Sequence, residues 1–134
     1  MSMADDMNAE RAEQQRFIAR LHAAEQASLK ALEQHLSRLV PDFVKSALAL
    51  NIRPDQGILR KCWNIELRVY DGTMISGEWP SSCDALVRIY TDGTWIHLGK
   101  KWKPGTSTFA TAAVPTETQV RDALKEWLRV KQMG

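Results

Sequence analysis

The chain has few of the residues that usually carry catalysis or bind metal. Only two of its 134 residues are cysteine and three are histidine, and Cys62 and Cys83 are too far apart for a CxxC pair. No GxGxxG, GxxxxGK[ST], GxSxG or HExxH motif is present. These absences argue against a zinc or iron site, a phosphate-binding loop and the common hydrolase sites. We therefore expect no enzymatic activity and no cofactor, and an enzymatic alternative would have to use His97 with Cys83.

Long apolar runs are absent as well. No run approaches the roughly 18 residues of a membrane-spanning helix, and residues 1–20 lack the apolar core of a signal peptide. Two cysteines are too few for the disulfide framework of a small secreted domain. The sequence therefore predicts a cytoplasmic protein, of a bacterial or phage type, with no membrane partner.

Glycine is missing from the first 56 residues, whereas six of the seven glycines lie between Pro54 and Pro115. Because glycine is costly in helices and useful in turns, this distribution separates a helical first part from a turn-rich middle. A chain of this length can bury one core without disulfides or metal. We predict a flexible N-terminus at residues 1–8 and a single α+β domain over residues 9–134.

Residues 9–51 are rich in good helix formers and contain an apolar stripe. Pro41 lacks a backbone N–H and is expected to break this helix, which leaves a short second helix after it. A straight helix of about 30 residues is about 45 Å long, which exceeds the roughly 36 Å diameter of a compact chain of this size. Either the N-terminus frays or a second copy covers it as a homodimer. The predicted self-association residues are the four leucines of the stripe, Leu29, Leu32, Leu36 and Leu39.

Residues 57–102 contain the same pattern twice, an alternating apolar run followed by Asp-Gly and a second run. Asp71-Gly72 and Asp92-Gly93 between such runs are typical of β-hairpin turns. In the first hairpin, a three-residue loop would pair Val69 with Thr73. The pattern predicts a four-stranded antiparallel meander made of two hairpins.

The register of the second hairpin decides which side chains share a face. A two-residue Asp92-Gly93 turn pairs Ile89 with Ile96 and Val87 with Leu98, which places these aliphatic residues on one side of the sheet. A slip by one residue would reverse this assignment. We predict that the aliphatic side chains face the core.

The end of the chain predicts a helix over residues 116–132. Thr116 and Gln119 fit a capping box, and Val120 and Leu124 begin an apolar face that also includes Trp127 and Leu128. This helix is expected to pack on the sheet. Residues 103–115 are rich in small side chains and are predicted to form a loop or a short strand.

The second face of the predicted sheet is the candidate binding surface. It combines aromatic and basic side chains, and a lysine cluster follows its last strand: Arg68, Tyr70, Arg88, Tyr90, Trp95, His97, Lys100, Lys101 and Lys103. Tyr, Trp and Arg are enriched at protein-binding hot spots. The same side chains can stack bases and contact phosphates. The N-terminal helix could also cover this face and turn it into a second core layer.

We expect a non-enzymatic protein that binds another protein as an adaptor or inhibitor and also self-associates. The alternative is a nucleic-acid-binding module that uses the basic and aromatic face. The net charge of +2 is too small to favour nucleic acid by itself, although residues 51–115 hold eight Lys and Arg against six Asp and Glu. The sequence does not identify the partner.

Overall fold

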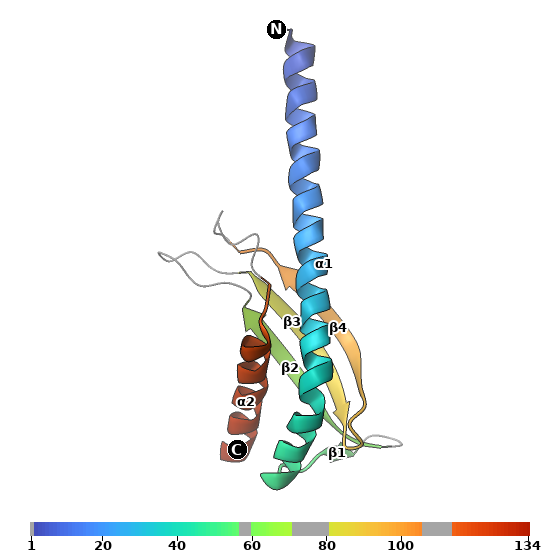
Figure 1. Cartoon of the computed structure of the whole chain (residues 1–134), viewed down its shortest axis with the longest axis vertical. Coiled ribbons are helices and arrows are strands. Elements are labelled where there is room, and N and C mark those ends of the chain that lie inside the picture. The colour runs from blue at the N-terminus through green and yellow to red at the C-terminus, as the bar shows by residue number, and fades with distance from the viewer. Residues whose placement is uncertain (1, 57–59, 71–80, 106–113) are drawn as a thin grey trace.

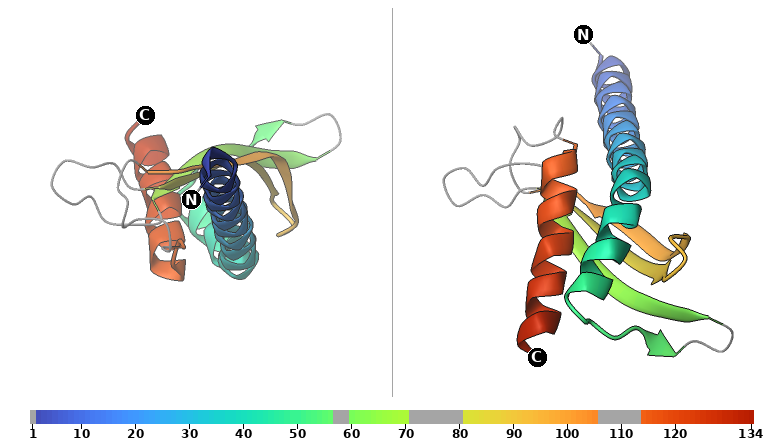
Figure 2. Two further views of the ribbon diagram at one scale, coloured as in Figure 1. Left: turned by 90° about the horizontal axis from the view of Figure 1, so that it is seen from above. Right: turned by 60° about the horizontal axis from the view of Figure 1, so that its bottom comes forward.

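The structure of the chain is a computed structural model that describes residues 2–56, 60–70, 81–105 and 114–134. Its elements, in chain order, are α1 (Met3–Ala49), β1 (Asp55–Gln56), β2 (Lys61–Tyr70), β3 (Ser82–Tyr90), β4 (Trp95–Lys103) and α2 (Glu117–Met133). Both helices lie on the same face of an antiparallel sheet (Figures 1 and 2). The predicted α+β class, with a long N-terminal helix and a C-terminal helix on the sheet, is confirmed.

The first helix passes through Pro41 without a break, so the prediction of two helices is wrong. Proline removes one backbone hydrogen bond, to the carbonyl of Ser37 one turn earlier. Both Pro41 and Ser37 are exposed, which leaves that carbonyl on the solvent side of the helix. On the opposite side, Val40 and Phe43 are buried in the core. The burial of Val40 and Phe43, which flank Pro41 along the chain, therefore outweighs the proline's local cost of about 3 kcal/mol.

The helix also begins earlier than residue 9. It starts at Met3, and the side chain of Ser2 caps it by accepting a hydrogen bond from the backbone N–H of Asp5 at 3.2 Å. Asp5 and Asp6 in the first turn suit the positive end of the helix dipole. Flexibility of residues 1–8 stays a prediction.

Three long strands make up most of the sheet, whose order is β1-β2-β3-β4. β2 pairs directly with β3, with Trp63 opposite Ile89 and Val69 opposite Cys83, and β1 adds only two residues. The predicted strand that begins at Thr73 lies outside the described residues, and so do residues 106–113 of the stretch that is predicted to form a loop or a short strand. The antiparallel sheet is confirmed, whereas a meander of two hairpins is not shown.

The hairpin between β3 and β4 has a three-residue loop, which corrects the predicted two-residue turn. The backbone N–H of Tyr90 donates to the carbonyl of Thr94 at 2.8 Å, and the N–H of Gly93 donates back to Tyr90 at 3.0 Å. Gly93 has φ +92°, a conformation that side chains other than glycine rarely adopt. Ile89 consequently lies opposite Trp95 instead of Ile96.

The corrected register exchanges the two faces of β4. Ile96 lies opposite Arg88, and His97 lies opposite the buried Val87. A β-bulge follows, because Gly99 pairs with Leu86 and leaves the intervening Leu98 without a partner. Trp95 and His97 therefore face the helices, and Ile96 and Leu98 point away from them.

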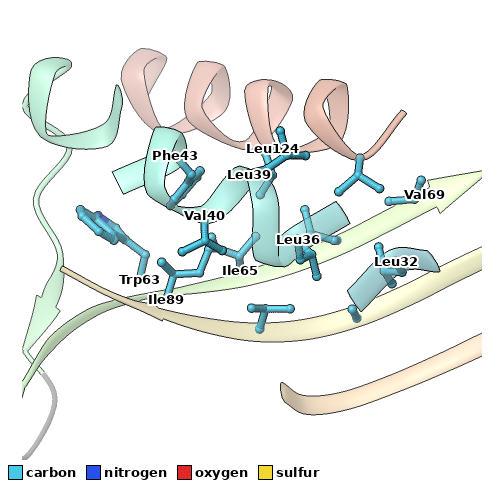
Figure 3. Packing of buried hydrophobic residues seen from close by; sticks show 14 of the residues in the cluster. Leu32, Leu36, Leu39, Val40, Phe43, Trp63, Ile65, Val69, Ile89 and Leu124 are labelled. Carbon is cyan, nitrogen blue, oxygen red and sulfur yellow. The ribbon is translucent and has the colours of Figure 1, made fainter. Parts of the chain in front are cut away.

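The core lies between the sheet and the two helices, as Figure 3 shows. Leu32 and Leu36 of α1 have an exposed fraction of 0%. Trp63 of β2 packs edge-on against Phe43 of α1, with ring centroids 5.8 Å apart. Its indole N–H donates to the carbonyl of Ile52 at 3.3 Å. The leucine stripe of α1 therefore packs within a single chain.

The C-terminal helix agrees with the prediction from the capping box. Gln119 N–H donates to the hydroxyl of Thr116 at 3.2 Å, and the Gln119 side chain accepts from the backbone N–H of Thr116 at 2.8 Å. Val120, Leu124 and Leu128 are buried against the sheet and α1. Local side-chain chemistry fixes the start of α2, and apolar burial fixes its orientation.

Candidate functional site

The candidate site is the sheet face that points away from α1 and α2, here called the outer face. Side chains alternate between the two faces of a strand, and the positions facing the helices are largely buried. Besides the buried Cys62 and Ser82, strand pairing places on the outer face Asn64, Glu66, Arg68, Tyr70, Asp84, Leu86, Arg88, Tyr90, Ile96, Leu98, Gly99, Lys101 and Lys103.

The predicted binding surface is divided between the two faces of the sheet. Six of its members lie on the outer face, Arg68, Tyr70, Arg88, Tyr90, Lys101 and Lys103. Trp95, His97 and Lys100 lie on the face that carries α1, where Trp95 packs against the core. Tyr90 and Trp95, both members of the predicted surface, therefore lie on opposite faces of the sheet.

A group of aliphatic side chains lies on the outer face over β3 and the edge strand β4, and the sequence reasoning missed it. Leu86, Ile96 and Leu98 have exposed fractions of 37%, 43% and 45%. The sequence signal for their position on the outer face is Thr94, directly after Asp92-Gly93. The Asp92 carboxylate accepts hydrogen bonds from the backbone N–H of Thr94 at 3.0 Å and from the hydroxyl of Thr94 at 2.6 Å. These bonds hold the turn that sets the register.

A hollow of about 580 Å³ lies beside this aliphatic group. Its lining includes Leu86, Gly99, Glu66, Arg68 and Lys101. A Cβ built on Gly99 would meet no atom within 4 Å, so the missing side chain contributes open space. The outer face thus offers a concave position next to exposed leucine side chains.

Most charged side chains on the outer face already have partners. Arg68 Nε lies 3.1 Å from Asp84 Oδ1, and Lys103 Nζ lies 3.2 Å from the other oxygen of the same carboxylate. These two bonds hold the Asp84 carboxylate between cations of two neighbouring strands. Arg88 donates to the Asn64 side chain at 3.0 Å. The rim is charged, but a large part of its charge is neutralised within the chain.

The hairpin end of the outer face is held by Arg60. Its guanidinium lies 3.8 Å from the centre of the Tyr90 ring and 3.2 Å from the Asp92 carboxylate. Hydrogen bonds from the hydroxyl and N–H of Thr94, together with Arg60, hold the pKa of Asp92 below its usual value. Arginine over an aromatic ring and against a carboxylate orients Tyr90 at one border of the site.

On the opposite face, Glu33 of α1 joins two of the predicted site residues. One of its carboxylate oxygens lies 2.6 Å from His97 Nε2 and 3.2 Å from Lys100 Nζ. Burial raises the pKa of Glu33, but the hydrogen bonds from Lys100 and His97 lower it by more, so the pKa lies below its ordinary value of 4.5. His97 and Lys100 therefore attach β4 to α1.

This cluster predicts a pH dependence of stability. Because the pKa of Glu33 is lower in the folded chain, its stabilisation is present above about pH 4.5 and is lost as the pH falls through the folded value. Glu33→Gln should cost less than about 1 kcal/mol at pH 7, since the pairs are partly exposed. It should also flatten the dependence of the unfolding free energy on pH between about pH 3 and 5, measured by urea denaturation.

Glu25→Gln on the same helix is the matched control. Glu25 forms no ion pair with any residue that the structure describes. It should leave the pH dependence unchanged. Equal curves for Glu33→Gln and the unmodified chain would mean that the cluster contributes nothing to stability.

In the part of the chain that the structure describes, Cys83 and His97 do not come together as a nucleophile and its base. Cys83 is fully buried, and His97 lies opposite Val87, four residues further along β3. At about 3.3 Å per residue these positions are roughly 13 Å apart, well beyond the hydrogen-bond distance that an activated thiol needs. Within the described ranges, no group of three His, Cys, Asp or Glu side chains could hold a metal ion.

A second concave region lies between the C-terminal half of α1 and α2. Its volume is about 340 Å³, and its walls include the buried Leu39, Phe43 and Leu124. Arg121 and Lys125 of α2 stand at its edge. These walls belong to the helix packing that closes the core, so we place the candidate site on the outer face.

The four leucines that were predicted to contact a second copy pack instead on the core of their own chain. Leu32, Leu36 and Leu39 belong to the core cluster, and Leu29 is partly buried against it. Their contacts are with the sheet and α2 of the same chain. A second copy would have to use another part of α1.

Comparisons with protein-family models, with curated proteins and with solved structures each gave no match. None of the described helices has the length and apolar character needed to cross a membrane.

Proposed function

We propose that the chain is a non-enzymatic protein-binding module, of the adaptor or inhibitor type, whose outer face binds another protein in the cytoplasm. The observation that carries this proposal is the group of three exposed aliphatic side chains, Leu86, Ile96 and Leu98, beside the hollow over Gly99. Exposed aliphatic residues that gather in one place on a sheet favour burial by a partner.

The surroundings of this group support a protein partner. Protein interfaces combine an apolar centre with a polar rim that contains arginine and tyrosine. Here Arg88 and Tyr90 lie on one side of the aliphatic group, and Lys101 lies on another. A partner that inserts an apolar side chain over Gly99 and places polar groups against this rim fits the surface.

Nucleic-acid binding remains the alternative proposal, with less support. Tyr70, Tyr90 and Lys101 lie on the outer face. However, Trp95 and His97 are on the other face, and Arg68 already contacts a carboxylate. Phosphate binding would have to displace that contact. This alternative requires binding to a single-stranded oligonucleotide that weakens steeply with salt.

Gly99→Val should separate binding from folding. Since a new Cβ meets open space and the backbone of Gly99 is not left-handed, a β-branched residue should stabilise the strand by up to about 1 kcal/mol. The same side chain projects into the hollow and should weaken capture of the protein partner by the immobilised chain from a lysate of the cells that produce it. Thermal unfolding and quantitative mass spectrometry of the captured proteins measure the two effects.

Leu98→Glu provides a second test on the same surface, and Val130→Glu on the exposed side of α2 is its control. Both remove an exposed aliphatic side chain and add one carboxylate. The proposal requires that Leu98→Glu lose the proteins that Val130→Glu retains. If Gly99→Val and Leu98→Glu both keep the same captured proteins, the outer face is not the binding site.

A further inference from the structure

The first part of α1 projects beyond the rest of the molecule (Figure 1). Four of its large apolar side chains are strongly exposed, from 52% for Phe17 and 64% for Ile18 to 69% for Met7 and 85% for Met3. Contacts with the chain's own core begin at Leu21. A helical segment of about 18 residues without packing is only marginally stable in water, so a partner along this segment would stabilise it.

The exposed segment carries a seam with the spacing of a coiled coil. Its positions are separated alternately by four and three residues, which places them along one side of the helix. The seam consists of Met3, Met7, Glu10, Gln14, Phe17 and Leu21. It continues along the helix to Ala24 and Ser28, which pack against the chain's own core or are buried. After Leu21, this side of α1 packs within the chain. Before Leu21, it contacts none of the core residues that the structure describes.

We propose that two copies of the chain form a homodimer by pairing their Met3–Leu21 segments in antiparallel orientation. The seam is symmetric about residue 12, so each seam position meets another seam position of the second copy. Met3 lies opposite the second copy's Leu21, and Met7 lies opposite its Phe17. This inference goes beyond the proposed function, because it does not involve the outer face.

The polar residues of the seam select the antiparallel orientation. In an antiparallel pair Glu10 lies opposite the second copy's Gln14, whose amide can donate to the carboxylate. In a parallel pair Glu10 would face Glu10 of the second copy, and two buried carboxylates repel each other. A polar position inside a coiled-coil seam is a known determinant of register and orientation.

The remainder of the chain favours the same orientation. After Leu21, the seam side of α1 packs on the chain's own core. A parallel partner helix would continue past Leu21 and collide with that core. An antiparallel partner helix instead begins near Leu21. The sheet of the second copy then lies at the opposite end of the paired segment.

Light scattering on the 134-residue chain tests the dimer. The mass should be twice the 15.2 kDa of one chain. Phe17→Asp should raise the dissociation constant at least about tenfold, because it places a carboxylate inside the seam. Ala19→Asp, on the opposite side of the same turn, is the matched control and should leave the mass unchanged. Circular dichroism checks that both variants remain folded.

Cysteine cross-linking tests the orientation. The variants Met7→Cys and Phe17→Cys should form a disulfide-linked dimer when they are mixed and oxidised, and neither should do so alone. Dimers formed by each variant alone would show a parallel pair. A monomer at all concentrations, a parallel cross-link, or equal effects of Phe17→Asp and Ala19→Asp would each overturn the proposal.

Discussion

Leu32→Asp is expected to unfold the chain. Leu32 has no exposed surface and lies in the core between α1 and the sheet (Figure 3). An aspartate at this position either buries an unpaired carboxylate or is protonated, and it also loses the apolar contacts of leucine. The cost of about 4 kcal/mol or more is comparable to the whole stability of a domain of this size. Circular dichroism and urea denaturation measure the loss.

Phe17→Asp on the exposed part of the same helix provides the contrast. It should leave the urea midpoint of the sheet and α2 nearly unchanged while it alters the mass of the assembly. Leu32→Asp should lower the midpoint or abolish the transition at any protein concentration. A folded Leu32→Asp chain that differs from the unmodified chain in oligomeric state alone would mean that the leucine stripe is an intermolecular contact.

Trp63→Ala is expected to cost about 3–5 kcal/mol. Trp63 is 2% exposed, its ring meets Phe43 edge-on, and its indole N–H donates to the carbonyl of Ile52. Alanine would leave a large cavity between β2 and α1 and would remove the hydrogen-bond donor of a buried carbonyl. Urea denaturation followed by far-ultraviolet circular dichroism gives the difference in unfolding free energy.

Trp95→Ala is the control, because Trp95 is only partly buried on the same face of the sheet. It should cost about half as much or less, in proportion to the smaller area that it buries. Similar losses for the two variants, or a loss below about 1 kcal/mol for Trp63→Ala, would contradict the arrangement of the core around Trp63.

The elements that the sequence predicted best are those fixed by local chemistry. The capping box of Thr116 and Gln119 has a short-range physical cause, and α2 begins where this motif places it. The spacing of Leu32 and Leu36 correctly identified an apolar side of α1. It did not reveal whether that side packs within one chain or between two, because both environments require the same pattern.

The errors arose where tertiary packing outweighs a local rule. Pro41 is a strong helix breaker in isolation, but the buried Val40 and Phe43 keep the helix continuous. In the second hairpin, the inward-facing pair could be either Trp95 with His97 or Ile96 with Leu98, because both pairs fit the alternation of a strand. The sequence pattern alone could not decide between them. The three-residue turn and the packing of Trp95 against the core made that choice.

This shift by one residue changes the functional argument. The predicted outer surface combined Tyr90, Trp95 and His97, a set that suits stacking with bases. The observed surface places Ile96 and Leu98 beside Arg88 and Tyr90. Exposed aliphatic side chains next to arginine and tyrosine are typical of a protein interface, so the proposal of a protein partner gains support and the nucleic-acid alternative loses it.

Site-specific photo-cross-linking in the producing cells tests the protein-binding proposal most directly. A photoreactive side chain at Ile96, on the outer face, should yield a cross-linked protein that is unaffected by nuclease treatment. The same group at Val130, equally accessible on α2, should not yield that species. Cross-linked nucleic acid at Ile96, or the same products from both positions, would contradict the proposal.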